Sequence, residues 1–255
     1  LFNAVHKAQV SWKRIKLLMK EDTYEDDSLV QEPGTLEVSD VSFAYPGGEK
    51  IYEDFNLSAT PGQIIGVTGA VACGKSTLGK TFLCEYPYEG RICFHGKELS
   101  GMTKAEQNGM VGYLGHDPEL FNDSVRNNIL LGDDDDPEKY LKAVCFDGEV
   151  AEMEEGMDTI VGNGGVRLSG GQAQRLALAR TLCHKRPVLI LDDPFSALDR
   201  KTEEEVFANL RKLAADSIVI LLSHRLYLFP EMDQVLWMED GKVTAGTHEQ
   251  ILEKF

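Results

Sequence analysis

The stretch Ile64–Thr77, IIGVTGAVACGKST, decides the fold. Ile64–Thr68 is mostly apolar, which is typical of a strand buried on both faces of a parallel sheet. The glycine-rich remainder has the pattern Gly-x4-Gly-Lys-Ser, and a helix is expected from Ser76 onward. The pattern indicates a phosphate-binding loop, but by itself it identifies only some P-loop nucleotide-binding protein.

The residue types of this loop predict how phosphate is held. A glycine-rich loop before a helix presents backbone N–H groups to phosphate oxygens. Lys75 is expected to place a positive charge between the β- and γ-phosphates, and Ser76 to offer its hydroxyl to Mg²⁺. The predicted nucleotide-binding residues of the loop are Gly69, Ala70, Val71, Ala72, Cys73, Gly74, Lys75, Ser76 and Thr77.

Two further elements follow the loop: Leu168–Arg175, LSGGQAQR, and an apolar strand that ends in Asp192 and Asp193. In this order the three elements resemble one family, the ABC ATPases, and the resemblance implies that the loop binds ATP. In that family the Leu-Ser-Gly-Gly-Gln segment caps the γ-phosphate of ATP held by another copy of the domain. The resemblance therefore implies that a partner's ATP is capped by Ser169, Gly170, Gly171 and Gln172.

The resemblance also implies roles for single residues around the phosphates. Tyr45 matches the aromatic residue on which adenine stacks, and His224 matches the family's switch histidine. Asp192 ends its strand at the carboxyl edge, where parallel sheets expose ligands, and is expected to hold Mg²⁺ through water. The implied catalytic residues are Lys75, His116, Asp193 and His224, and the implied Mg²⁺ ligands are Ser76, Asp192 and His116.

Three positions depart from the family pattern. Ala72 stands where glycine is usual, so a Cβ enters a loop that passes close to phosphate. His116 replaces a glutamine that reaches Mg²⁺ and the γ-phosphate, and Asp193 replaces the glutamate that polarises the attacking water. Aspartate is one methylene shorter, so its carboxylate retreats by about 1.5 Å, and a shift of about 1 Å can cost on the order of 10²-fold in rate. We therefore expect this site to bind ATP and hydrolyse it slowly.

A weakened site beside an intact capping motif resembles one half of an asymmetric, heterodimeric ABC exporter, whose partner site is fully active. Thr159–Gly165 also resembles the exporter segment that contacts the membrane domain, although Ile160, Asn163 and Gly164 differ from the usual Glu, Glu and Arg. The alternative is a non-hydrolysing regulatory module that gates an attached membrane protein through ATP-dependent closure. A third interpretation, a soluble ABC protein without a membrane partner, is disfavoured by the linker resemblance described below.

Composition narrows the class of partner. Lys plus Arg number 26 against 42 for Asp plus Glu, a formal net charge of −16, which argues against binding of DNA or RNA. The cysteines show no paired metal-ligand spacing, which favours reduced thiols. The longest apolar runs are far shorter than the roughly 20 residues of a spanning helix. We predict a soluble domain at the cytoplasmic face of the membrane, partnered by a second ABC ATPase domain and by the transporter's transmembrane domain.

Resemblance and residue patterns together predict an α/β fold. It consists of a P-loop NTPase core with a parallel sheet, an N-terminal antiparallel β subdomain and a helical subdomain. Residues 34–115 and 183–255 are assigned to the core with its β subdomain, and residues 116–182 to the helical subdomain. Residues 1–33 are expected to be a linker from a membrane domain, because Ala8–Ile15 resembles that segment of exporters. An ordinary surface helix is the alternative for this N-terminal stretch.

Some element boundaries are predicted as well. Leu36–Val38 and Val41–Tyr45 alternate apolar and polar residues, as half-buried strands do. A helix is expected over Thr202–Ala214, and either Asp123 or Ser124 is expected to cap a helix that begins at the next apolar residue. The four aspartates Asp133–Asp136 are interpreted as a helix N-terminal charge cluster or a solvated loop rather than a metal site.

Overall fold

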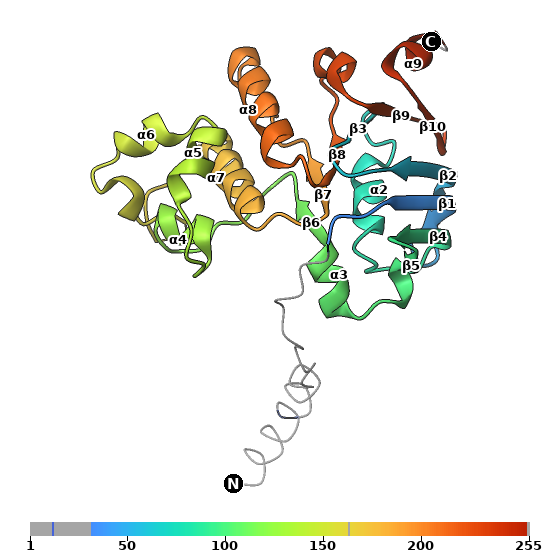
Figure 1. Ribbon diagram of the computed structural model, residues 1–255, viewed down its shortest axis with the longest axis horizontal. Coiled ribbons are helices and arrows are strands. Elements are labelled where there is room, and N and C mark those ends of the chain that lie inside the picture. Colours follow the sequence, from blue (N-terminus) through green and yellow to red (C-terminus); the bar gives the residue numbers. More distant parts are fainter. Residues whose placement is uncertain (1–11, 13–31, 163, 254–255) are drawn as a thin grey trace, which may run out of the picture.

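The computed structural model describes residue 12, residues 32–162 and residues 164–253. The predicted linker, residues 1–33, lies outside this described part apart from residues 12, 32 and 33. Figure 1 shows the strands gathered on one side of the molecule and a lobe of helices on the other. Among the described residues, no helix combines the length and the apolar character that a membrane span requires.

The described strands form a sheet in the order β5-β4-β1-β2-β10-β9-β3-β8-β7-β6. β9, β3, β8, β7 and β6 run parallel, whereas β5, β4, β1 and β2 run antiparallel. The pairing of Lys242 with Glu53 attaches β10 to β2 and so joins the two sections. The strands are β1 Leu36–Ala44, β2 Lys50–Ala59, β3 Ile64–Gly69, β4 Glu89–Phe94, β5 Lys97–Glu98, β6 Val111–Leu114, β7 Val188–Asp192, β8 Ile218–Leu222, β9 Gln234–Glu239 and β10 Lys242–Gly246.

Burial explains the apolar runs of the parallel section. Every residue of β7 and β8 is buried. Leu189 and Leu191 pack in one hydrophobic cluster with residues of the helices α7 (Gly170–Cys183) and α8 (Arg200–Leu213). Ile190 packs in a second cluster with Leu78 of α2 (Lys75–Thr81). Successive strand residues point to opposite faces, so a strand covered by helices on both faces is apolar at every position. The predicted α/β fold is thereby confirmed.

β1 differs from its prediction, because one continuous strand replaces the two expected over Leu36–Val38 and Val41–Tyr45. Its pairing with β2 shifts register between Val38 and Val41, and Asp40 has a φ of 50°. A bulge of this kind places an extra residue in one strand without ending the pairing. The break in the apolar alternation therefore marks a bulge and not a turn.

The helical lobe contains α4 to α7, and α7 packs on α4 and α5 in the larger hydrophobic cluster. Ser124, one of the two predicted caps, accepts the N–H of Asn127 and begins α4. Asp136 caps α5, so one of the four aspartates serves the helix N-terminus as interpreted from the sequence. The helices are α2 Lys75–Thr81, α3 Lys104–Met110, α4 Val125–Leu130, α5 Pro137–Ala143, α6 Asp147–Ala151, α7 Gly170–Cys183, α8 Arg200–Leu213 and α9 His248–Leu252.

α8 begins at Arg200, before the predicted start at Thr202. The Asp199 side chain accepts hydrogen bonds from the backbone N–H groups of Lys201 and Thr202. A carboxylate in this position satisfies donors that the first helical turn leaves unpaired. Asp199 therefore ends the loop that follows β7 and fixes where the helix starts.

Candidate nucleotide site

The glycine-rich loop joins β3 to α2, as its sequence predicts. Gly69 and Gly74 have φ angles of 149° and 102°, and Ala72 has a φ of 65°. Glycine reaches such angles without steric cost, whereas an L-residue with a Cβ pays roughly 1–2 kcal/mol in the left-handed region. Ala72 thus carries backbone strain at the position where the sequence resemblance leads one to expect glycine.

Lys75 folds back over this loop. Its Nζ donates to the carbonyl oxygens of Gly69 at 3.0 Å and Ala70 at 2.9 Å, and lies 3.8 Å from Cys73 Sγ. These bonds hold the ammonium group against the backbone of the loop, close to the start of α2. The positive charge and the N–H groups at the start of α2 are therefore available to the same anionic ligand.

A cavity of about 470 Å³ lies over the loop and the carboxyl ends of β7 and β8. The structure brings together in it most of the residues predicted to act on the phosphates, although they come from four separate segments. Its lining is formed by Val71, Ala72, Gly74, Lys75, Ser76, Thr77, His116, Asp192, Asp193, Leu222, Ser223 and His224. The carboxyl edge of a parallel sheet is where ligands bind in open α/β folds.

Asp192 is the last residue of β7 and is 7% exposed. Its Oδ2 accepts a hydrogen bond of 3.2 Å from the hydroxyl of Tyr113. Tyr113 lies on β6, the strand that pairs with β7. Burial raises the pKa of the Tyr113 phenol, and the Asp192 carboxylate raises it further. Tyr113 therefore keeps its proton and holds one Asp192 oxygen in place.

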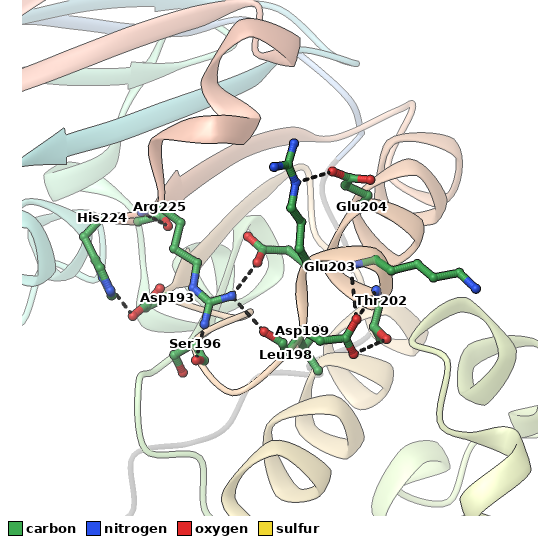
Figure 2. A network of polar contacts seen from close by, with 12 residues as sticks. Asp193, Ser196, Leu198, Asp199, Thr202, Glu203, Glu204, His224 and Arg225 are labelled. Carbon is green, nitrogen blue, oxygen red and sulfur yellow. Dashed lines mark hydrogen bonds and ion pairs between the residues drawn. The ribbon is translucent and has the colours of Figure 1, made fainter.

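Asp193 follows β7 with a φ of 50°, and its N–H donates to Leu222 O at 2.8 Å. Its Oδ2 lies 3.3 Å from Nδ1 of His224 and 4.0 Å from Nδ1 of His116. Figure 2 shows the His224 ring directed at this carboxylate. Within the described residues, Oδ1 of Asp193 is buried without a hydrogen-bond partner. One carboxylate of the cavity is thus flanked by both predicted histidines.

Tyr45 is placed differently from the other predicted residues. It is 37% exposed and packs edge-to-face against Phe43 and Tyr86, with ring centroids 5.0 and 5.3 Å apart. It is not among the residues that line the cavity. Its exposed ring directly follows the end of β1, at the antiparallel section, and its predicted contact with adenine stays a prediction.

The four predicted capping residues also lie apart from this cavity, at the N-terminus of α7. The Ser169 hydroxyl accepts the N–H of Gln172 at 3.3 Å, and the Gln172 side chain accepts the N–H of Ser169 at 2.8 Å. This reciprocal pair is a capping box. A Cβ built on Gly171 would lie 3.1 Å from Ala197 Cβ and 3.2 Å from Ala197 O, so the helix start lies close to the loop after β7.

Glu149 of α6 secures this helix start, which the sequence did not reveal. It accepts Nε2 of Gln172 at 2.7 Å and Nη2 of Arg175 at 2.5 Å. Arg175 also donates to Cys145 O at 2.7 Å and lies over the Phe146 ring, 4.9 Å from its centroid. These partners come from α6 and from the two residues that precede it, so sequence spacing gives no signal for them.

Arg225 and Glu203 form a second arrangement that the sequence analysis missed. Glu203 is fully buried on α8, and its Oε2 accepts Nη1 of Arg225 at 2.6 Å. A sequence signal did exist, because Glu203 shares the spacing of the buried Val206, Phe207 and Leu210. A carboxylate in the apolar stripe of a helix requires a buried partner.

The residues of the cavity fit Mg²⁺ carried by a nucleotide. Among the described residues, no group of three or more His, Cys, Asp or Glu side chains could by itself hold a metal ion. Mg²⁺ does not need such a cage, since it is usually bound by one or two carboxylates, water and substrate phosphates. Ser76 and Asp192 line the same cavity and supply that small set of oxygen donors.

Comparison with known proteins identifies the family. The family model described as ABC transporter matches residues 52–196. YheI of Bacillus subtilis, a probable multidrug resistance ABC transporter ATP-binding/permease protein, is 33% identical over 263 residues, covering 99% of this chain and 45% of the relative. The ATP-dependent lipid A-core flippase of Pseudomonas fluorescens is 36% identical over 238 residues, covering 90% and 39%.

A solved structure described as a bacterial Atm1-family ABC exporter with ATP bound superposes with a TM-score of 0.86 at 26% identity, covering 99% of this chain and 47% of that one. The chain belongs to the ABC transporter family, and its similarity extends to exporters, as its motifs predict. It spans less than half the length of these relatives.

Proposed function

We propose that this chain is the ATP-binding and ATP-hydrolysing domain of an ABC exporter, with a weakened catalytic site of its own. The observation that carries the proposal is the cavity in which Lys75, Ser76 and Asp192 lie beside Asp193, where the family resemblance leads one to expect glutamate. The glycine-rich loop and Lys75 would bind the phosphates, and Ser76 and Asp192 would hold Mg²⁺. Mg²⁺, when bound, neutralises charge on the β- and γ-phosphates.

Asp193 is the residue that would orient the attacking water. Its Oδ2 faces the Nδ1 atoms of His224 and His116, whereas its Oδ1 is buried, so a water in the cavity would have to share Oδ2 with imidazole. A carboxylate about 1.5 Å further back than that of glutamate leaves the water poorly aligned. The rate of the chemical step is lowered while the binding groups stay intact.

The partners follow from the capping motif and from the relatives. Ser169, Gly170, Gly171 and Gln172 lie outside the chain's own cavity, which supports the proposal that they cap ATP in a second ABC ATPase domain. The relatives' names include permease and exporter, so we propose that the transporter's transmembrane domain is the other partner, at the cytoplasmic face of the membrane. Residues 116–182 are proposed to act as the helical subdomain and residues 1–33 as the linker.

Nucleotide binding is the first test of this assignment. Titration of the purified chain with a fluorescent ATP analogue should show saturable binding that requires Mg²⁺ for full affinity and is competed by ATP. The Lys75→Ala variant should lose most of that affinity, because a hydrogen bond to a charged group contributes about 1.5–3 kcal/mol, or roughly 10- to 150-fold in affinity. Equal binding by Lys75→Ala would contradict the proposed site.

A matched control shows whether the loss of affinity depends on the position of Lys75 or only on the loss of one positive charge. Lys80 lies in the last turn of the same helix, α2, and is exposed. Lys80→Ala removes one positive charge from the same helix without touching the loop, so its affinity for ATP should equal that of the unmodified chain. Sedimentation of the chain with ATP and Mg²⁺ then reports whether nucleotide promotes dimer formation.

A further inference from the structure

Arg225 connects two loops that leave neighbouring strands. It follows His224 after β8, and its guanidinium donates to the carbonyl oxygens of Leu198 at 2.8 Å and Ser196 at 2.5 Å, in the loop after β7. Figure 2 shows the guanidinium lying between this loop and Glu203. The side chain next to the switch histidine therefore binds the backbone of Ser196–Asp199 at two points.

Glu203 fixes the position of this guanidinium. Its side chain is fully buried, and its Oε2 lies 2.6 Å from Nη1 of Arg225. Charge-assisted hydrogen bonds of this kind are short and directional, and a buried carboxylate cannot exchange its partner for water without a large cost. Arg225 thus connects the loop to α8 through an ion pair with a fully buried carboxylate, whereas the Arg200–Glu204 pair on the same helix is exposed at both ends.

The two carbonyl groups bound by Arg225 lie on either side of Ala197. Ala197 is the residue that approaches Gly171 at the start of α7, where a Cβ would lie 3.2 Å from Ala197 O. Only a glycine allows this approach without displacing the loop. A continuous series of contacts therefore runs from Asp193 and His224, through Arg225 and Ala197, to the Ser169–Gln172 segment.

We infer that Arg225 is a positioning residue that couples the chain's own nucleotide cavity to its capping segment, Ser169–Gln172. The inference rests on the proposed function, in which His224 lines the chain's own nucleotide site while the capping segment serves a partner's site. When nucleotide moves His224, Arg225 moves with it along the backbone and displaces the Ser196 and Leu198 carbonyls. Ala197 then transmits the displacement to Gly171 within one chain.

The test is hydrogen–deuterium exchange of the purified chain with and without ATP and Mg²⁺, at a dilution where sedimentation shows a monomer, because in a dimer the capping segment would contact the partner's ATP directly. In the unmodified chain, nucleotide should change exchange at the phosphate loop and also at Ala197 and Gly170–Ala173, by about fivefold or more, the lower end of ordinary coupling between sites. In the Arg225→Met/Glu203→Leu double variant, the phosphate loop should still respond and Gly170–Ala173 should not. Replacing both partners avoids the unpaired buried charge that either single change leaves.

Two further variants distinguish coupling from a merely structural role. Arg200→Met/Glu204→Leu removes the exposed ion pair from the same helix and should keep both responses. Glu203→Gln keeps the shape of the side chain and an oxygen that can accept from Arg225, so it should restore the response at Gly170–Ala173 that the double variant loses. Loss of that response in a folded Glu203→Gln variant would overturn the inference. Thermal denaturation confirms that each variant is folded.

The outcomes separate this inference from the proposed function. A response of the phosphate loop without any response at Gly170–Ala173 in the unmodified chain overturns the coupling and leaves ATP binding intact. A response at Gly170–Ala173 that survives in the Arg225→Met/Glu203→Leu variant also overturns it. No response anywhere in the unmodified chain overturns the proposed nucleotide site and, with it, the coupling.

Discussion

Nδ1 of His224 lies 3.3 Å from Oδ2 of Asp193, although the two residues follow different strands of the sheet. The contact is possible because β8 and β7 pair in parallel and expose their carboxyl ends at the same edge. Asp193 enters it with a left-handed backbone, φ 50°, a conformation that aspartate tolerates better than most residues. The short side chain and the unusual backbone conformation therefore belong to the same local arrangement.

The backbone of Asp193 affects how glutamate would be accommodated there. We expect Asp193→Glu to lower the free energy of unfolding by about 0.5–1 kcal/mol, because glutamate adopts the left-handed backbone conformation less readily than aspartate does. Asp240→Glu is the matched control, since Asp240 has a φ of 47° in the turn between β9 and β10, away from the cavity. Urea denaturation measures both, and a loss confined to Asp193→Glu would assign the cost to the cavity instead of to the backbone.

Ala72 carries strain that glycine would relieve. Ala72→Gly should remove roughly 1–2 kcal/mol of steric cost, because glycine adopts the left-handed region freely. It should add about 0.5–1 kcal/mol of entropic cost, because glycine loses more conformational freedom on folding. The net effect should be a slight stabilisation of the fold. Ala70→Gly, in the same loop without a positive φ, should only destabilise. Denaturation in urea compares the two, and equal destabilisation by both substitutions would show that the φ of Ala72 stores no strain.

Removal of Arg225 alone should be far more damaging than removal of Arg200. Arg225→Met leaves the fully buried Glu203 carboxylate without its partner, which typically costs about 3–5 kcal/mol. Arg200→Met breaks an exposed pair and should cost less than about 1 kcal/mol. Chemical denaturation at neutral pH measures both values. Similar losses in the two variants would mean that Glu203 finds another partner or gains access to water.

Glu149 predicts a pH dependence at the start of α7. Burial acts to raise the pKa of this carboxyl, but hydrogen bonds from Gln172 and Arg175 outweigh it and hold the pKa below its usual value of 4.5. A lowered pKa in the folded state gives stability above the unfolded pKa that is lost as pH falls through the folded pKa. The stability advantage over Glu149→Gln should therefore be present at neutral pH and shrink below about pH 4.5.

The measurement is urea denaturation of both proteins across that pH range. Glu138→Gln on α5 is a suitable control, because Glu138 forms an exposed ion pair with Lys142. Its difference from the unmodified chain should stay small at every pH. A constant advantage for Glu149 down to the lowest pH would contradict the role given to its charge.

The sequence predicts most reliably those elements whose residues are all buried or all follow one pattern of burial. β7 and β8 are buried along their whole length, so their apolar runs identify them. The phosphate loop was predictable for a different reason, because the residues that would bind phosphate are consecutive in the sequence. The bulge at Asp40 was not, because a register shift depends on the partner strand and on the backbone conformation of one residue.

The candidate site was predicted in part. Lys75, Ser76, Asp192, Asp193, His116 and His224 line one cavity, but Tyr45 does not. The residues that position the site escaped prediction, because Glu149 acts on α7 from another helix and Arg225 acts on a loop from a different strand end. Such contacts exist only after the chain has folded: the spacing of Glu203 in the apolar stripe of α8 signals a buried partner but not which residue supplies it.

The central claim concerns the rate of hydrolysis at the chain's own site. Steady-state ATPase activity should be measured at high protein concentration for the unmodified chain, Asp193→Glu and Asp193→Glu/His116→Gln, with ATP binding verified for each. We predict slow turnover by the unmodified chain and a clear gain in at least one variant. Brisk turnover by the unmodified chain, or no gain in either variant despite bound ATP, would contradict it.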